Sequence, residues 1–571
     1  LESMISHRKP STQHAWFPWA LVLVAAWGAQ IFAWRAAFYM DDMPHILMRD
    51  TVTGDAALAF GWKGRFLTFA LWRGVFTLFG ESSAAFHGLN WLLHGAVAML
   101  SFGVLRGFVR LGPEHLREHA SSLALWGALI FAVHPLCVEP VHYAAQTSLL
   151  LGTLLAMLAA GGFLKWRETN RMVYAILSIA FVFLAGMAKE AGFFHALILL
   201  FFMMMLGDSS ERSWAWLGRR RNRIALWVVL GGLAMVFAQT WFGIVLGRAQ
   251  NIEGMSHHWL TQSRVLGEYL WRMFVPTGLS SDHHIAWTLS WGDKEAVMKF
   301  IVVMVSGLWI LERYLRGRRW FAALLGLCLF HLLLRFAYPV DEPMVEYRTY
   351  PCMPWVGLLI AFGVREVTDL RFPRLLWVSR ATLALIVLSF AVLTLSRSHV
   401  WQSERTLVMN VLQRYPLNLR AMGIYFKNLV MDGQSDAVLM GAEMPDMVSD
   451  QILSVNDGND RQFSGRRLNL DYAACQYYII RAHLQRDDAE TALGKAETLL
   501  ADLITGRRHG GPETMFTACL SQALCYEVLG DAQEVERALE MARPLLPNAD
   551  ELPEMLDAEL ILLGKAARVR S

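Results

Sequence analysis

Two adjacent carboxylates, Asp41 and Asp42, occur in the stretch FYMDDMPHI, directly after a hydrophobic run that begins near Phe17. An ionisable side chain at the edge of a membrane span is costly unless water solvates it or a reaction uses it. One carboxylate of such a pair can accept a proton as a general base, while its neighbour orients it or restrains its titration. The alternative is structural, because aspartate is a good N-terminal cap for a following helix. The dipeptide alone favours neither interpretation.

Further ionisable side chains occur at the ends of other hydrophobic runs. The stretch HPLCVEPVHY contains Pro135 and Pro140, which interrupt a helix and free backbone groups, as is tolerated where a cavity is lined. The alternative for this stretch is a simple turn between two helices. A second stretch, AKEAG, contains Lys189 and Glu190, for which the alternative is an adjacent ion pair or a lysine that snorkels to the membrane edge. The ionisable residues of these stretches and of VEYRTYP are His134, Glu139, His142, Lys189, Glu190, Glu346 and Arg348.

One polar helix face is also visible in the sequence. His87, Asn90 and His94 are spaced three and four residues apart, so they share one side of a helix. They could form the wall of a polar cavity or be satisfied within the packing, and the spacing leaves both interpretations open.

Cations and carboxylates gathered at headgroup depth suit one kind of chemistry. The phosphate of a lipid-linked sugar lies at this depth, where Arg and Lys can hold it and stabilise the charge that develops as the glycosidic bond breaks. A carboxylate beside it can deprotonate an acceptor hydroxyl, as a general base for transfer with inversion. A metal ion is not required if cations already neutralise the phosphate.

The elements that must position these residues are membrane helices. The chain has 571 residues, 55% of them hydrophobic and only 18% charged, which is too apolar for an ordinary soluble protein. A membrane span needs about 20 apolar residues. The chain has eleven apolar runs of this length or slightly shorter, so we expect about eleven spans. The apolar runs are 16–37, 88–106, 121–138, 143–164, 172–188, 192–207, 223–246, 298–312, 320–336, 351–364 and 376–396.

Basic residues predict the orientation of these spans, since short cytoplasmic loops accumulate Lys and Arg. Alternate loops are rich in arginine, so we expect a cytoplasmic tail over 1–15, with 1–3 a cloning remnant ahead of Met4. The runs on either side of Lys189 could instead form one broken or re-entrant helix. The segments expected outside are 38–87, 139–142, 247–297, 337–350 and everything after 397.

Charge and cysteine content exclude other classes of function. A net charge of only +3 argues against a nucleic-acid partner. The six cysteines have no metal-ligand spacing, and we expect them to be buried apolar residues rather than disulfides.

The residues after 397 have the polar pattern of soluble helices. The stretch ACLSQALCYEVLGDAQEVERALEMARPLLPN has small and apolar residues at the spacing of a tetratricopeptide helix pair, with Gly530 at the turn and Pro547 ending the second helix. A looser copy includes Pro416 and Gly433. We therefore predict a tetratricopeptide-like helical domain over 398–571.

Several stretches together resemble one family. FYMDDMPHI, GRFLTFALWRGVFTLFGESSAAFHGLNWLLH, IFAVHPLCVEPVHYAAQTSLLLGTLLAML, AGMAKEAGFFHALILLFF and VEYRTYPCMPWVGLLIA occur in family order. They resemble the membrane O-mannosyltransferase-like proteins with C-terminal tetratricopeptide repeats, within the GT-C superfamily of polyprenyl-phosphate-sugar-dependent glycosyltransferases. The chain departs from the family pattern at RFL, QTS and EYRTYP, which bears on the sugar and the acceptor more than on the fold.

The resemblance implies an all-α fold: a polytopic transmembrane bundle over 16–397, followed by the helical repeat domain. Carried to matching positions, it implies Asp41 as the catalytic base with Asp42 supporting it. It implies donor-phosphate contacts from Arg65, Lys189 and Arg348, and an acceptor or sugar side formed by His134, Glu139, Glu190 and Glu346.

The implied activity is inverting transfer of a monosaccharide from a polyprenyl phosphate to an extracytoplasmic acceptor. The acceptor would be a protein hydroxyl or a surface glycan, and the repeat domain would present it. We expect a bacterial cytoplasmic membrane, with the C-terminal domain in the periplasm. Two other classes stay open: a transporter or flippase, whose intramembrane polar groups would mark a substrate path, and a non-catalytic assembly scaffold.

No cofactor is predicted, although clustered histidines in the external segment 247–297 make a metal the minor alternative. Adjacent histidines point to opposite sides of a helix, which argues against shared ligation by His257 with His258 or by His283 with His284. This segment is predicted to contain a short amphipathic or re-entrant helix over the site.

Overall fold

A computed structural model describes residues 16–54, 65–206, 252–288, 290–337, 342–371, 376–447, 464–505, 512–545 and 556. Every regular element within these ranges is a helix, so the predicted all-α class is confirmed. The chain divides into two compact units. The first comprises 1–281, 290–339 and 345–404, and the second comprises 282–289, 340–344 and 405–571. The predicted tail 1–15 and the predicted span 223–246 lie outside the described residues.

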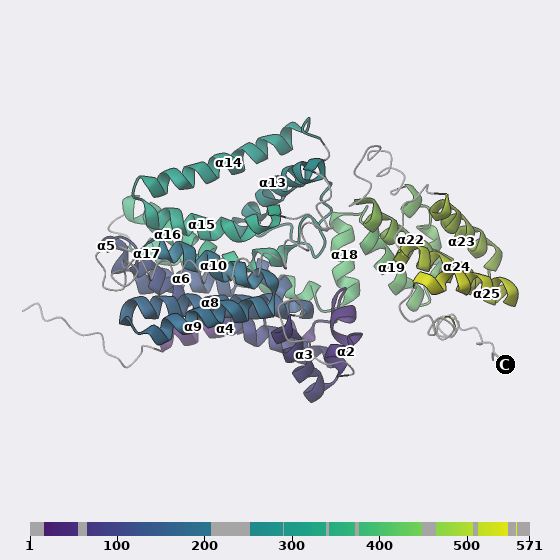
Figure 1. Cartoon of the computed structure of the whole chain (residues 1–571), viewed down its shortest axis with the longest axis horizontal. Helices are drawn as coiled ribbons and strands as arrows, with labels where there is room; N and C mark the ends of the chain where they lie inside the picture. Colours follow the sequence, from purple (N-terminus) through teal and green to yellow (C-terminus); the bar gives the residue numbers. More distant parts are fainter. Residues whose placement is uncertain are drawn as a thin grey trace, which may run out of the picture. The chain divides into compact units, whose positions relative to one another are not determined.

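The first unit is a bundle of long apolar helices, several of which run side by side (Figure 1). Helix α8 packs against α4, α9 and α10, and α6 packs against α4 and α16. The helices of this bundle are α1 (Phe17–Ala29), α4 (Ser83–Arg110), α6 (Ala120–Ala132), α8 (Thr147–Thr169), α9 (Met172–Ala188), α10 (Glu190–Met204), α14 (Lys294–Leu315), α15 (Arg319–Leu333), α16 (Met353–Arg371) and α17 (Leu376–Val400).

The chain is a membrane protein with several spans. Among the described residues, five helical segments are long and apolar enough to cross a membrane, or six if α6 and the bent segment Pro135–His142 form one span. Helices α9 and α10 are shorter than a full span. They pack against each other on either side of Lys189, so this region is two separate helices. The five segments are Phe17–Arg35, Ser83–Arg110, Ala144–Thr169, Arg319–Phe336 and Trp377–Val400.

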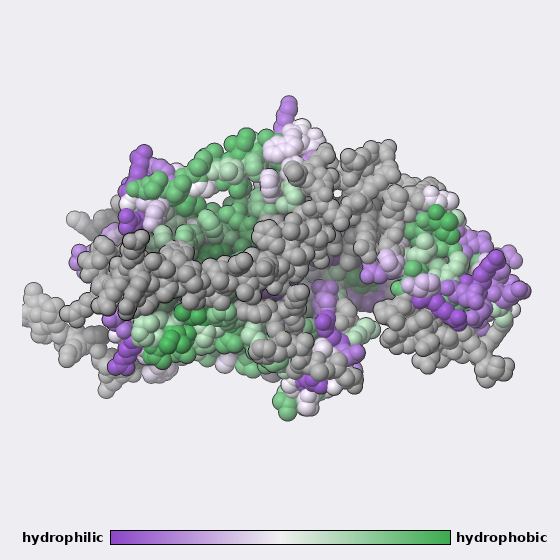
Figure 2. Space-filling model, viewed as in Figure 1, coloured by the Kyte–Doolittle hydropathy of each residue, from purple (hydrophilic) through white to green (hydrophobic). Residues whose placement is uncertain are grey.

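Shorter elements lie in the segments expected outside the membrane. Helices α2 (Asp50–Thr53) and α3 (Phe66–Phe79) follow the first span, and α13 (Ile252–Phe274) is the amphipathic helix expected within 247–297. Helix α13 packs against α14, whose outer surface is strongly apolar (Figure 2). Exposed hydrophobic side chains on α14 include Ile301, Val305 and Leu308, as expected where lipid covers a helix.

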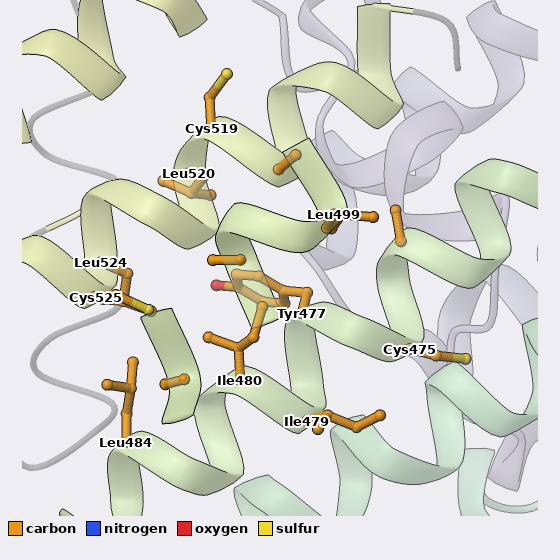
Figure 3. Close-up of a cluster of buried hydrophobic side chains, with 14 of the residues drawn as sticks. Cys475, Tyr477, Ile479, Ile480, Leu484, Leu499, Cys519, Leu520, Leu524 and Cys525 are labelled. Carbon is orange, nitrogen blue, oxygen red and sulfur yellow. The ribbon is translucent and has the colours of Figure 1, made fainter. Parts of the chain in front are cut away.

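The second unit is built of helices that pack against one another in chain order. Helix α19 (Leu419–Met431) packs on α22 (Ser464–Gln485), which packs on α23 (Ala489–Ile504), then α24 (Pro512–Leu529) and α25 (Ala532–Ala542). Their shared core contains Tyr477, Ile480 and Leu524 (Figure 3).

Two turns of the second unit have the glycines that the repeat pattern predicted. Gly433 and Gly530 have φ of 73° and 85°, which glycine adopts without steric cost. The predicted helix end at Pro547 lies outside the described residues. All six cysteines of the chain are buried and unpaired.

Candidate functional site

A pocket of about 100 Å³ opens beside the break between α9 and α10. It brings together the three cations that the sequence assigned to a donor phosphate, Arg65, Lys189 and Arg348, and it adds Arg335. We call this site, with these four cations and Glu190, the cation pocket. Its remaining wall includes His195, His331 and Tyr347.

Cations outnumber carboxylates among the described residues that form the wall of the cation pocket. Four cationic side chains face one carboxylate, that of Glu190, among the described residues that form its wall. Arg65 Nε donates to both carboxylate oxygens of Glu190, at 3.2 and 3.1 Å. The excess positive charge in a confined space favours binding of an anion. Glu190, predicted for the acceptor or sugar side, is thus paired with Arg65, predicted for the donor phosphate.

Lys189 reaches the pocket because the chain is extended there, with φ of −154° and ψ of 138° between two helices. Its Nζ donates to Gln146 Oε1 at 3.2 Å and lies 5.3 Å from the centre of the Tyr347 ring. Among the described residues, the ammonium group is thus held by an amide and an aromatic face, with no carboxylate in ion-pair contact.

Arg335 is the cation of this pocket that sequence reasoning missed; His195, His331 and Tyr347 were not predicted for the site either. It lies in a 3₁₀ turn, η6 (Leu334–Ala337), at the end of the predicted span 320–336. Two side chains of α13 fix the backbone of this turn: His258 Nε2 donates to the Arg335 carbonyl at 2.7 Å, and Trp259 Nε1 donates to the Phe336 carbonyl at 2.9 Å. An arginine at the end of an otherwise apolar run was the signal that could have identified it.

Two carboxylates predicted for the acceptor or sugar side, those of Glu139 and Glu346, accept hydrogen bonds from backbone N–H groups. Glu139 Oε2 accepts from Tyr347 N at 2.9 Å, and Glu346 Oε1 accepts from Ser280 N at 2.7 Å. Both side chains are almost fully buried. They anchor η7 (Glu346–Cys352), the turn that carries Arg348. Neither is among the described residues that form the wall of the cation pocket.

His134 has a similar structural position. Its Nδ1 accepts from Leu136 N at 3.1 Å, and its Nε2 donates to the Met273 carbonyl at 3.1 Å. The ring is fully buried against Phe390 and joins the turn at 134–137 to the end of α13. It does not contribute to the wall of the cation pocket.

Two of the three polar residues on one face of α4, Asn90 and His94, form hydrogen bonds within the packing. Asn90 donates to the Tyr143 carbonyl at 2.9 Å and accepts from the Thr147 hydroxyl at 2.6 Å. His94 lies 2.9 Å from the Tyr350 hydroxyl and 3.1 Å from the Ala132 carbonyl. The interpretation as satisfied packing residues fits Asn90 and His94, which secure the segments that position the cation pocket.

The two aspartates have different environments. Asp42 is fully buried, and its carboxylate accepts from Tyr39 N at 3.0 Å and from Ala145 N at 2.6 Å. Asp41 is exposed, and among the described residues no hydrogen bond or ion pair to its carboxylate occurs. Its backbone N–H donates to the Tyr143 hydroxyl at 3.0 Å. Asp42 therefore fixes the loop, and Asp41 presents a carboxylate that is available for chemistry.

The loop that carries Asp41 lies close to the cation pocket through shared neighbours. Asp42 binds Ala145, and the next residue, Gln146, binds Lys189. Burial lowers the pKa of His45, the Asp41 carboxylate opposes that effect, and Arg65 adds to it. Asp41 and Arg65 thus act on the same imidazole, although Asp41 is not among the described residues in the pocket wall.

The backbone is strained both at the loop that carries Asp41 and at Arg65 of the cation pocket. Met40, directly before Asp41, and Arg65 each have φ of 45°, which is uncommon for residues other than glycine. Such strain persists only where the surrounding structure imposes it, and it occurs preferentially at functional sites.

Burial raises the pKa of Asp42 to about 8, while the backbone N–H groups of Tyr39 and Ala145 act in the opposite direction. The pKa in the folded state lies above the ordinary value of 3.8, so the folded state binds this proton more tightly than the unfolded state. Stability from Asp42 is therefore largest below about pH 4 and falls as the pH rises to about 8. We expect the melting temperature of Asp42→Asn in detergent to vary less between pH 5 and 8 than that of the wild type.

The quantity to compare is the slope of melting temperature against pH in the wild type and in Asp42→Asn. This comparison is independent of any constant change in stability that the substitution causes. Asp50→Asn, at an exposed position in α2, is the control and should keep the wild-type slope. Equal slopes for wild type and Asp42→Asn would show that Asp42 does not titrate in this range.

A larger apolar pocket of about 500 Å³ lies between α10, α13, α14 and α15. We call it the apolar pocket. Its wall includes Phe202, Leu266, Val303, Ile310 and Phe330. Helices α10 and α15 contribute to both pockets, so a charged chamber and a hydrophobic chamber are built on the same two helices.

Comparison with known proteins gives one related sequence. The chain is 29% identical over 222 residues to the human protein named protein O-mannosyl-transferase TMTC4. The match covers 34% of this chain and 30% of the human protein, so the chain spans less than a third of that relative's length. No family model matches the chain, and no solved structure matches it. The relationship is to an O-mannosyltransferase, over part of each protein.

Proposed function

We propose that the protein is an inverting glycosyltransferase that moves a monosaccharide from a polyprenyl-phosphate carrier to a hydroxyl group of an acceptor protein. The observation that carries this proposal is the cation pocket, where four cations and one carboxylate are among the described wall residues. The exposed carboxylate of Asp41 acts on the same imidazole, that of His45, as the pocket residue Arg65. Mannose is the first sugar to test, because the human relative is named for its transfer.

The donor would use both chambers. Its phosphate suits the guanidinium groups of Arg335 and Arg348, because planar N–H donors match phosphate oxygens. Its hydrocarbon tail suits the apolar pocket, which shares helices α10 and α15 with the cation pocket. A single amphiphile with an anionic head and a long apolar tail satisfies both sites.

The chemical step follows from the charges. Asp41 takes the proton of the acceptor hydroxyl as the oxygen attacks the anomeric carbon. The bond from that carbon to the phosphate oxygen breaks, and the phosphate leaves with the electron pair. The cations that hold the phosphate stabilise its added negative charge. Attack opposite the leaving group inverts the anomeric carbon.

The arginine-rich loops support a site on the outer side of the membrane, which would be a bacterial cytoplasmic membrane. This orientation would allow transfer to exported proteins. The C-terminal unit would present the acceptor as a tetratricopeptide-like domain, since stacked helix pairs offer a concave peptide-binding surface.

The direct test uses the purified full chain with polyprenyl-phosphate-mannose and peptides rich in serine and threonine. Mass spectrometry should find a mass increase of one hexose per modified peptide, and released polyprenyl phosphate should appear in equal amount. A flippase would instead move the intact lipid across vesicles with no modified peptide. That second result would replace the enzymatic proposal.

The apolar pocket can be filled at Gly307 on α14, where an added Cβ would meet no other atom within 4 Å. We expect Gly307→Phe to weaken binding of a long-chain polyprenyl phosphate by about tenfold, equivalent to about 1.4 kcal/mol. Binding of a ten-carbon prenyl phosphate should change much less, because its tail is short. Titration calorimetry of both ligands measures this, and equal losses for both would place the tail elsewhere.

A further inference from the structure

A second cationic chamber lies at the far ends of α4 and α8, with a volume of about 1180 Å³. We call it the basic groove. Helices α1 and α9 complete its wall. Four cations and one carboxylate are among the described residues that form it: Arg106, Arg110, Lys165, Arg167 and Glu168.

The basic groove is separated from the cation pocket by about one membrane thickness. Helix α8 begins directly after Gln146, which binds Lys189 of the cation pocket, and Lys165 follows 19 residues later. At a rise of 1.5 Å per residue, these ends are about 28 Å apart. The hydrocarbon core of a bilayer is about 30 Å thick. The two cationic sites therefore lie at opposite headgroup layers.

Cations outnumber carboxylates among the described residues that form the groove. Lys165 Nζ lies 2.8 Å from Glu168 Oε2, the one carboxylate among these residues. Arg106 Nε is buried and has no hydrogen-bond partner among the described residues. A buried donor without a partner is costly, so an anion with several acceptor oxygens would be stabilised here.

The same groove has an apolar wall with free space. Leu158, Leu177 and Phe181 line it, and Leu177 is 42% exposed. Gly161 also lines it, and an added Cβ there would meet no atom within 4 Å. An occupant that complements both parts has a negative headgroup and a hydrocarbon chain.

We propose that the basic groove binds an anionic phospholipid, with the headgroup phosphate against Arg106 and Arg110 and an acyl chain along α9. Basic pockets between membrane helices at headgroup depth are suited to such lipids. The site is distinct from the cation pocket and does not depend on the proposed activity. It would couple the stability of the bundle to the lipid composition of the opposite leaflet.

The test uses the purified full chain in detergent with phosphatidylglycerol or phosphatidylcholine of identical acyl chains. We expect phosphatidylglycerol to raise the melting temperature and to remain bound in native mass spectrometry, with at least a tenfold preference over phosphatidylcholine. Arg106→Gln combined with Arg110→Gln should abolish the preference. Arg316→Gln is the matched control, because Arg316 is exposed and does not line the groove.

Two further arms identify the ligand. Gly161→Phe fills the groove at an unobstructed position, so it should reduce lipid binding without unfolding the protein. Glycerol phosphate should stabilise the wild type much less than the lipid does. Equal binding of the two lipids, unchanged binding in Gly161→Phe, or full stabilisation by glycerol phosphate would each overturn the proposal.

Discussion

Replacing Asp41 by asparagine should lower the rate of sugar transfer by about 10²- to 10⁴-fold, the usual contribution of a general base. The amide cannot accept the proton of the acceptor hydroxyl, although it has nearly the same shape as the carboxylate. Because Asp41 is exposed and its carboxylate has no partner among the described residues, the variant should fold normally. The measurement is a single-turnover transfer assay with saturating donor and acceptor.

Two variants make that result specific. Asp50→Asn removes a nearby exposed carboxylate of α2 and should keep the wild-type rate. Asp41→Glu keeps the base but moves it by one methylene, so it should recover part of the activity. Transfer by Asp41→Asn within twofold of the wild type would exclude this residue as the base, even if the protein proves to be a glycosyltransferase.

Much of the fold could be predicted because membrane helices are encoded by local composition. Ten of the eleven predicted runs overlap a helix, and the eleventh lies outside the described residues. The predicted runs 172–188 and 192–207 correspond closely to α9 and α10, but the sequence left open that they form one broken helix, because only Lys189 separates the two helices. The turn glycines Gly433 and Gly530 were readable, since a left-handed conformation restricts residue type.

The candidate site was predictable only in part, because the sequence shows that a residue is charged but not what it faces. Arg65, Lys189 and Arg348 do share a pocket. Glu139 instead accepts from the backbone N–H of Tyr347, which is 208 positions away in the chain. No local pattern encodes such a contact.

Arg335 was missed for a different reason. It stands inside an apolar run, where a helix of spanning length was the simplest interpretation. The run ends as the 3₁₀ turn η6, and α13 binds the backbone of that turn through His258 and Trp259. The position of this arginine therefore depends on a helix distant in sequence, which only the three-dimensional structure reveals.

Arg335→Gln should weaken binding of a polyprenyl phosphate by roughly 10- to 150-fold, the effect of losing a charge-assisted hydrogen bond of about 1.5–3 kcal/mol. Arg335 lines the cation pocket, and the contact from His258 uses its backbone carbonyl. The substitution therefore leaves the attachment of α13 in place, and the melting temperature should change little. Titration of the purified variant with polyprenyl phosphate measures the loss.

Arg335→Lys and Arg35→Gln complete this experiment. Lysine keeps the charge but not the planar fork of donors, so Arg335→Lys should recover only part of the affinity. Arg35 is an exposed arginine that lies over the Phe32 ring outside the cation pocket, and Arg35→Gln should bind the ligand as the wild type does. If Arg335→Gln binds the ligand as tightly as Arg35→Gln, the phosphate does not occupy this pocket. Loss of a cation from the wall of the pocket would lower the affinity for a bound dianion.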